Sequence, residues 1–357
     1  MNSTSENRFI YSMKFIACLF VITIHAPFPG FFGEIISCIS RFAVPFFFAT
    51  SGRFLLRGSE GGTITGTGLV RKKTGSSLLK LLKVTGIVYV IYLLFSLIIH
   101  FFYGYSFKDW FTSKFNLFEA RNFFLFNSGQ FIYDWTYVFD HLWYLFALIY
   151  VYGLIYIFAP VLRSWYKVLI GLLLGFLFLG ELLQTYYPIR PFGISISTWY
   201  VIRNWLFVGM PFVLIGILFG DYVSAKTETG PGEASVFFEK HRLKSIIGLV
   251  IGIILSFAEY RFIGSKEVYL GSVIIVVSLL FLSESKCSES TFLADIGKKA
   301  SGNIYFFHVL VIAVLDQLSQ NGIIPLYLGA FKPLIVMAVC VLMFYFLPKA
   351  ALGAKSN

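Results

Sequence analysis

Charged side chains are scarce in this sequence: Asp, Glu, Lys and Arg make up only 13% of its 357 residues, whereas 57% of the residues are hydrophobic. The mean hydropathy is +0.78. This balance excludes an ordinary soluble domain. Several apolar stretches reach about 20 residues, the length needed to cross a hydrocarbon layer roughly 30 Å thick. The composition therefore indicates a polytopic membrane protein.

Cysteine is also rare, with four residues and no CxxC pair. Cys18, Cys38 and Cys340 fall in apolar stretches, and Cys287 falls in a segment that we place in a cytoplasmic loop. None of the spacings is typical of a metal site. We expect neither a disulfide nor a bound metal.

Hydropathy predicts an all-α fold with about ten transmembrane helices. The predicted ranges are 9–28, 35–56, 78–102, 141–159, 167–182, 200–219, 245–260, 268–283, 301–319 and 326–347. We expect one membrane domain over residues 1–349, followed by a short cytoplasmic tail over 350–357.

The net charge of +11 has a ready explanation in the positive-inside rule. With the N-terminus inside, most Lys and Arg residues fall in cytoplasmic segments, so both termini are predicted to be cytoplasmic. The basic residues are then expected to face a membrane rather than nucleic acid. The predicted location is a bacterial inner or plasma membrane, and the oligomeric state is left open.

Two connecting segments have a distinctive composition. Residues 58–75 are rich in Gly and Thr, but they do not match GxxxxGK[ST], so a flexible cytoplasmic linker is expected. Residues 103–140 are rich in Phe, Tyr, Trp and Asn, which is typical of a loop at the membrane interface.

Polar residues inside apolar spans need an explanation, and the first is His25. Lys14 lies eleven residues earlier, so both side chains fall on nearly one face of a helix, with Lys14 about 16 Å deeper. A histidine satisfied by a backbone carbonyl is the structural alternative.

Arg41 opens the second span, and Gly52 falls on the same face eleven residues later. Pro45 and the Ser51-Gly52 pair loosen this helix and favour a crevice between helices. A guanidinium in such a crevice suits a carboxylate, a phosphate or a developing oxyanion. Snorkelling of Arg41 to the interface is the alternative.

Further polar residues lie in two later spans. Asp140 and His141 open the fourth span, and Trp143 and Tyr144 follow at the interface, where aromatic anchoring is a sufficient explanation. In the ninth span, Ser301, Tyr305 and His308 share one face, and the predicted boundaries place His308 about 10 Å from the cytoplasmic edge. Two histidines at different depths would form a polar track, whereas Asp316 and Lys332 are expected to make a structural pair.

Four motifs follow one another in a specific order: K-x-I-A-x-x-x-V-x-x-I-H from Lys14, S-R-x-x-V-P-x-F-F-x-x-S-G from Ser40, H-L-W-Y-L from His141 and I-Y-F-F-H from Ile304. This order resembles the integral membrane acyltransferase family 3, in its stand-alone form. The resemblance implies transfer of an acyl group, commonly acetyl, from cytoplasmic acyl-CoA to a hydroxyl of a surface carbohydrate.

The resemblance also implies site residues. His25 and Arg41 take the catalytic positions, with His25 as general base or acyl-imidazole nucleophile and Arg41 as oxyanion partner. Supporting positions are Lys14, Ser51, Gly52, His141, Trp143, Tyr305 and His308. The chain departs from the family pattern at Tyr11, where an acidic residue is usual, and at Lys14-Phe15, where Arg-Gly is frequent.

Several expectations complete this interpretation. Glu34, in the predicted loop between the first two spans, is a candidate to orient His25. Basic residues Arg71, Lys72 and Lys73 are candidates to bind the acyl-CoA on the cytoplasmic side. The expected partners are membrane lipid and a carbohydrate acceptor. The alternatives are a transporter or flippase of a lipid-linked sugar that uses a histidine proton relay, and a purely structural membrane subunit.

Overall fold

A computed structural model of the chain describes residues 7–58, 62–126, 129–130, 140–186, 205–228, 233–285, 291–325 and 329–353. These residues form helices, and the β-structure among them is a single bridge between Arg57 and Thr63. The predicted all-α class is therefore confirmed. The predictions for Cys287, for residues 131–139 of the aromatic loop and for the tail residues 354–357 lie outside the described residues.

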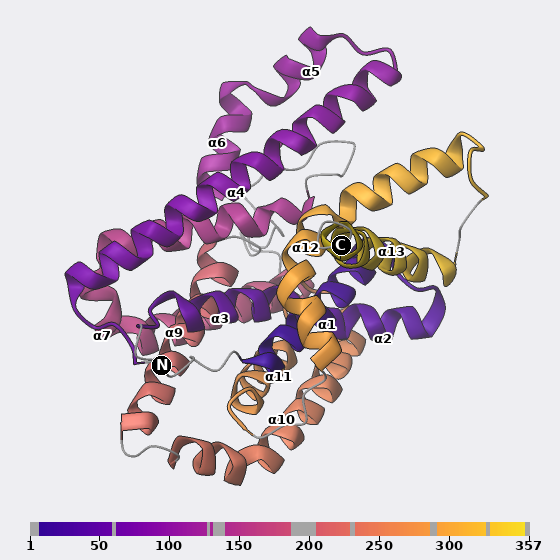
Figure 1. Cartoon of the computed structure of the whole chain (residues 1–357). Helices are drawn as coiled ribbons and strands as arrows, with labels where there is room; N and C mark the ends of the chain where they lie inside the picture. The colour runs from indigo at the N-terminus through magenta and orange to yellow at the C-terminus, as the bar shows by residue number, and fades with distance from the viewer. Residues whose placement is uncertain are drawn as a thin grey trace. The chain divides into compact units, whose positions relative to one another are not determined.

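The chain divides into two compact units, Met1–Phe47 with Lys226–Asn357 and Phe48–Ala225, and each is described by itself. The first unit contains α1 (Arg8–His25), α2 (Gly30–Ser40), the start of α3 (Ala43–Leu55), α10 (Glu233–Ile263), α11 (Leu270–Leu282), α12 (Thr291–Gln320), α13 (Phe331–Val341), the π-helical turn η4 (Leu342–Phe346) and α14 (Leu347–Gly353) (Figure 1). The second unit contains the rest of α3, α4 (Thr67–Phe102), α5 (Phe107–Lys114), α6 (Leu117–Phe126), the 3₁₀ turn η1 (Asp140–Leu142), α7 (Trp143–Tyr186), the π-helical turn η3 (Trp205–Gly209) and α9 (Met210–Glu228).

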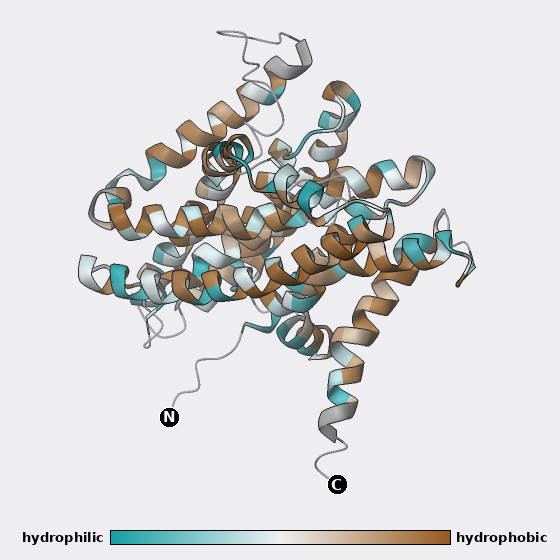
Figure 2. Ribbon diagram, turned by 90° about the horizontal axis from the view of Figure 1, so that it is seen from above, coloured by the Kyte–Doolittle hydropathy of each residue, from teal (hydrophilic) through white to brown (hydrophobic). Residues whose placement is uncertain are grey.

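Eight helical stretches in the described part of the chain are long and apolar enough to cross a bilayer. The other two predicted spans, 141–159 and 268–283, correspond to the shorter apolar helices Trp143–Ala159 and Leu270–Leu282. Hydrophobic residues dominate the long helices (Figure 2). The chain is thus a multi-pass membrane protein, and the cytoplasmic placement of its termini stays a prediction.

In the first unit, α1 packs extensively against α12 (Figure 1). Tyr11, Cys18 and His25 recur every seven residues along α1, so they lie along one seam. Gly297 of α12 packs on the carbonyl oxygen of Tyr11, where any β-carbon would overlap that oxygen. Further along, the Cys18 thiol donates to the Ser301 carbonyl at 3.2 Å. The two helices are therefore in close backbone contact from their N-terminal ends.

Helix α12 begins at Thr291, well before the predicted start at 301. Its first turns carry Asp295, Lys298 and Lys299, which lower the local hydropathy without preventing a helix. The Lys299 ammonium lies 2.7 Å from the Asp295 carboxylate one turn earlier, an i,i+4 pair that supports the helical conformation. Hydropathy detects only the part of a helix that lies in lipid, so the prediction missed this polar extension.

The predicted second span is two helices, α2 and α3, which are separated by a turn at Arg41 and Phe42. Pro45 accounts for this break, because it lacks an N–H and its ring clashes with the carbonyl four residues earlier, that of Arg41. Pro45 sits in the first turn of α3, where a missing N–H is tolerated. The prediction of one continuous helix over 35–56 is therefore wrong.

The predicted linker 58–75 is also partly wrong, because α4 begins at Thr67. Before that helix, the backbone N–H of Ile64 donates to the carbonyl of Leu56 at 2.8 Å, which closes a short loop. Thr63 in this loop hydrogen-bonds Ser224 of α9 at 2.8 Å. Arg163 donates to the Ile64 carbonyl at 2.9 Å and pairs with Asp221 at the same distance.

The aromatic segment after α4 contains two short helices, α5 and α6. Ser106 caps α5: its hydroxyl accepts the Asp109 N–H at 3.2 Å, and its own hydroxyl and N–H donate back to the Asp109 carboxylate. These hydrogen bonds hold the pKa of Asp109 below its usual value. The indole of Trp110 on α5 donates to Ser96 of α4 at 3.1 Å, which attaches the segment to the preceding helix.

The second unit depends on a close crossing of α3 and α9. A β-carbon at Gly52 would overlap the carbonyl oxygen of Val213, and one at Gly216 would overlap that of Ala49. Small residues allow helix backbones to approach in this way inside a membrane. Gly52, a predicted supporting residue of the site, thus has a direct packing role.

We expect Gly52→Ala to lower the free energy of unfolding by about 1–3 kcal/mol, because the new methyl group must displace a packed backbone. The thermal unfolding midpoint of the purified protein in detergent measures this. Gly86→Ala in α4 is the matched control, because a β-carbon there meets nothing within 4 Å. Equal midpoints for the two variants would contradict the proposed crossing constraint.

Candidate active site

The structure brings together two of the candidate histidines. The rings of His25, at the end of α1, and His308, on α12, have their centroids 5.2 Å apart. His308 is fully buried. Its Nδ1 atom lies 2.8 Å from the Tyr305 carbonyl oxygen and 3.2 Å from that of Ile304. Because a carbonyl only accepts, Nδ1 carries a proton, and in the neutral ring Nε2 is then a hydrogen-bond acceptor.

This contact corrects the prediction that the histidines occupy different depths. That prediction counted from a helix start at 301, but α12 begins at Thr291, which places His308 about 25 Å along the helix instead of about 10 Å. The two imidazoles therefore form a pair at one depth, and they do not form a polar path across the membrane.

Helices α1 and α2 are joined next to the catalytic candidates. The hydroxyls of Thr23 and Ser40 hydrogen-bond each other at 2.9 Å, and both residues are buried. Thr23 lies two residues before His25, and Ser40 is the residue before Arg41. A buried hydrogen bond of this kind fixes the register of the two helices. It therefore fixes the position of the helix end that carries His25 relative to the helix end that carries Arg41.

Arg41 pairs with Glu267, a residue that the sequence reasoning did not select. The guanidinium Nη1 lies 3.3 Å from a Glu267 carboxylate oxygen, and the two side chains are 18% and 26% exposed. The Nε–H of Arg41 is buried and has no hydrogen-bond partner among the described residues. Buried donors without a partner are rare in folded proteins. In the sequence, Glu267 stands out only as an acidic residue in the connection between the predicted spans 245–260 and 268–283.

Lys14 and Tyr305 lie in the same unit. The Lys14 ammonium lies 6.0 Å from the centroid of the Tyr11 ring, on the seam that α1 presents to α12. The buried Tyr305 ring is 5.2 Å from that of Phe47 and 6.0 Å from that of His308. The Tyr305 ring thus packs directly beside the histidine pair.

Glu34 is not in a loop, as was predicted, but within α2, which begins at Gly30. Its side chain is exposed. The helix starts earlier than expected because Pro29 ends the preceding turn and Gly30 adopts a φ of 65°, a conformation that glycine takes without strain.

The remaining supporting residues form a cluster within the second unit. The Ser51 hydroxyl lies 3.2 Å from that of Tyr144, and Phe48 contacts the rings of Trp143 and Tyr144 at 5.9 and 4.6 Å. His141 is buried, and its Nε2 lies 3.3 Å from the Tyr92 hydroxyl on α4. A separate hydrogen-bonded aromatic cluster, defined by these residues, thus joins α3, α4 and the start of α7.

The basic residues predicted to bind the donor lie in the first turns of α4, and all three are exposed. Arg71 has a structural role, because it donates to the carbonyls of Tyr156 and Ile157, each at 3.2 Å. Helix α7 has a non-helical residue, Phe158, at this point, and Pro160 has no N–H to give to the Tyr156 carbonyl. The guanidinium therefore satisfies acceptors that the kink exposes.

Comparisons with known proteins bear on this architecture. The acyltransferase family 3 model, which describes an acyltransferase domain, matches residues 7–347 and so includes both units. The chain belongs to acyltransferase family 3. Comparisons with curated proteins and with solved structures gave no significant match. Among the residues that the structure describes, no group of three His, Cys, Asp or Glu side chains is arranged to hold a metal ion.

Membership of family 3 makes this chain a membrane-bound acyltransferase, which uses an acyl donor and an acceptor. The four sequence motifs that resemble this family all lie within the matched residues. The roles assigned to individual residues, and the domain boundary at 349, stay predictions. Helix α14 continues from Leu347 to Gly353, across that boundary.

Because Arg71 satisfies the kink of α7, we expect Arg71→Ala to lower the free energy of unfolding by about 0.5–1.5 kcal/mol. Lys72→Ala, at the next and equally exposed position, is the control and should unfold at the temperature of the parent. Thermal unfolding is measured together with the KM for the acyl donor. Unchanged unfolding in both variants, with an equal rise in donor KM, would instead assign Arg71 to the donor.

Proposed function

We propose that this family 3 member is an O-acyltransferase that moves an acetyl group from cytoplasmic acetyl-CoA to a hydroxyl of a cell-surface carbohydrate or its lipid-linked precursor. The cell membrane is the proposed location, with both termini inside. The observation that carries the proposal is the pair of imidazoles, His25 and His308, at 5.2 Å within a family 3 match. His25 is partly exposed and His308 is fully buried. This arrangement suits proton transfer between a substrate that reaches His25 and the protein interior.

In the proposed reaction, His25 takes the proton of the acceptor hydroxyl, and the resulting oxygen nucleophile attacks the carbonyl carbon of the thioester. The C–O bond forms as the carbonyl oxygen becomes an oxyanion. The C–S bond then breaks, and the leaving thiolate takes the proton from the His25 imidazolium. The products are the acyl ester and the free thiol of coenzyme A.

His308 supports His25 in this scheme. The carbonyls of Tyr305 and Ile304 hold its Nδ1 proton, so in the neutral ring its Nε2 presents a lone pair. A neutral neighbour lets His25 become an imidazolium without the repulsion that a second cation would cause.

Arg41 is proposed to stabilise the oxyanion. Its Nη1 contacts Glu267, and its buried Nε–H has no partner among the described residues. A donor that is fixed and already desolvated before the reaction needs little reorganisation when the oxyanion forms. Glu267 then acts as a positioning residue, because it holds the guanidinium without contacting the reacting atoms.

Two further groups of residues, both in the second unit, receive proposed binding roles. Lys72 and Lys73, exposed in the first turns of α4, are proposed to attract the phosphates of acetyl-CoA. The aromatic cluster, which includes Ser51, His141, Trp143 and Tyr144, contains hydroxyls and flat rings, the kinds of group that suit a sugar. Lys14 and Glu34 keep their assignment as supporting residues.

We expect His25→Ala to lower acetyl transfer about 10²- to 10⁴-fold, because the reaction loses its general base. Membranes that contain the protein are supplied with labelled acetyl-CoA and a carbohydrate extract, and label in the acceptor is measured. His241→Ala is the matched control, because His241 lies on α10 and bonds the Phe237 carbonyl of its own helix. Retained transfer in His25→Ala would refute the mechanism, and no acetyl transfer by the parent protein would refute the function.

For Glu267→Gln we expect a fall in kcat of about ten-fold, because Arg41 loses the charge that orients it. The KM values and the thermal unfolding midpoint should change little. Asp316→Asn is the control, since it breaks the ion pair with Lys332 at 2.9 Å, whose side chains are similarly exposed. An unchanged kcat in Glu267→Gln, or an equal fall in the control, would contradict a positioning role.

A further inference from the structure

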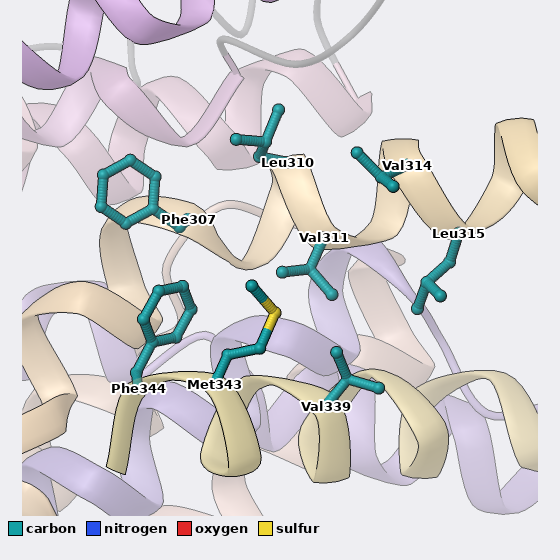
Figure 3. Close-up of a pocket in the computed structure, with 8 residues that line it drawn as sticks. All are labelled: Phe307, Leu310, Val311, Val314, Leu315, Val339, Met343 and Phe344. Carbon is teal, nitrogen blue, oxygen red and sulfur yellow. The ribbon is translucent and has the colours of Figure 1, made fainter. Parts of the chain in front are cut away.

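An apolar groove of about 400 Å³ lies between α12 and the segment formed by α13 and η4 (Figure 3). Its lining contains only apolar side chains: Phe307, Leu310, Val311, Val314, Leu315, Val339, Met343 and Phe344. In Figure 3, Val339 and Met343 extend from one helix toward Val311 and Leu315 of the other. The volume is within the range of ligand-binding pockets.

The dimensions of the groove match a lipid chain. Phe307 and Phe344 stack with their ring centroids 5.8 Å apart and close one end. From Phe307 to Leu315 the helix rises about 12 Å, most of the roughly 15 Å thickness of one leaflet. Val314 and Met343 are 39% and 44% exposed, so the groove opens to the surface of two candidate membrane spans.

The backbone of one wall is irregular at this place. Met343 and Phe344 belong to η4, a π-helical turn over Leu342–Phe346 between α13 and α14. A π turn holds an additional residue per turn, is rare, and is often found at functional sites. It presents both side chains to the groove, so the irregular backbone coincides with the lining.

The two walls are linked by polar bonds near both ends of the groove, but the ends differ in charge. Beyond Phe344, the Tyr345 hydroxyl bonds the Asp295 carboxylate at 2.7 Å, and Lys299 pairs with the same carboxylate. The Lys349 ammonium lies 5.4 Å from the centroid of the Tyr345 ring. Lys299 and Lys349 therefore lie close to a single carboxylate, and Lys298 is exposed next to Lys299 in the sequence.

At the opposite end, beyond Leu315, Lys332 and Asp316 form a neutral pair at 2.9 Å. Among the described residues at the two ends, positive charge is therefore in excess at the end that carries Lys299 and Lys349. From Phe344 to Lys349 the helix rises about 7 Å, a short distance from the groove to the charged end.

We propose that this groove is a binding site for an anionic phospholipid. One acyl chain fills the apolar lining, and the phosphate group lies beside Lys299 and Lys349 at the charged end. Lipid is the surrounding solvent in this part of the molecule, and basic residues next to a membrane-spanning helix attract anionic headgroups. The site is separate from the histidine pair, because none of its lining residues is a catalytic candidate.

The experiment measures lipid bound to the purified full-length protein by native mass spectrometry. The protein is offered phosphatidylglycerol and phosphatidylcholine with the same chains, inorganic phosphate, and a polyprenyl phosphate. We expect preferential binding of phosphatidylglycerol. We expect Lys349→Gln to reduce that preference about five-fold, which corresponds to about 1 kcal/mol for one lysine near the headgroup. Val311→Trp should remove the bound lipid, because the indole fills the groove.

Two control variants separate the groove from the rest of the surface. Lys240→Gln removes an exposed lysine of α10, and Val250→Trp adds an indole at a position on α10 that is 49% exposed. Both should keep the bound lipid, and Lys349→Gln changes only an exposed side chain, so its folding should be retained.

Several outcomes would overturn the proposal. Equal binding of phosphatidylcholine would show that the charged end selects no headgroup. Equal binding of inorganic phosphate would show a simple anion site without a chain, and preference for the polyprenyl phosphate would assign the groove to a carrier lipid. None of these measurements uses an acyl donor, so they are independent of the proposed catalytic mechanism.

Discussion

The close packing of α1 on α12 is the constraint on which the candidate site depends. It begins where Gly297 lies on the Tyr11 carbonyl, continues through the bond from Cys18 to Ser301, and ends where His25 meets His308. In a membrane the hydrophobic effect contributes little to the association of helices, so close backbone contact and hydrogen bonds must supply the specificity. A side chain at Gly297 would separate the helices and thereby the two imidazoles.

A second constraint is that lipid cannot satisfy backbone groups, so each irregular turn needs a partner from the protein. The break at Arg41–Phe42 and the kink at Phe158 both precede a proline. At the kink, Arg71 supplies the donors that Pro160 cannot. At the break, the chain turns beside Arg41, so the irregular backbone also sets where the guanidinium lies.

Helix α12 serves several purposes along its length. Its first turns carry Asp295, which bonds Tyr345. Its middle carries Tyr305 and His308, and residues Phe307 to Leu315 include one wall of the apolar groove. The proposed lipid would therefore contact the same helix that presents His308, one turn from Val311. Such a lipid would stabilise the helix that positions the catalytic pair, without any contact with the reacting groups.

The sequence by itself determined the membrane class, the approximate positions of the apolar spans in the described part of the chain and the polar residues worth testing, because hydropathy and short motifs are local properties. It also predicted the Asp316–Lys332 pair, which the structure confirms. Only the tertiary structure decided that His308 meets His25, that Glu267 holds Arg41 and that Arg71 completes a kink in α7. Each of these depends on the register between helices far apart in the chain. That register is set by small residues and buried hydrogen bonds, which leave no periodic signal in the sequence.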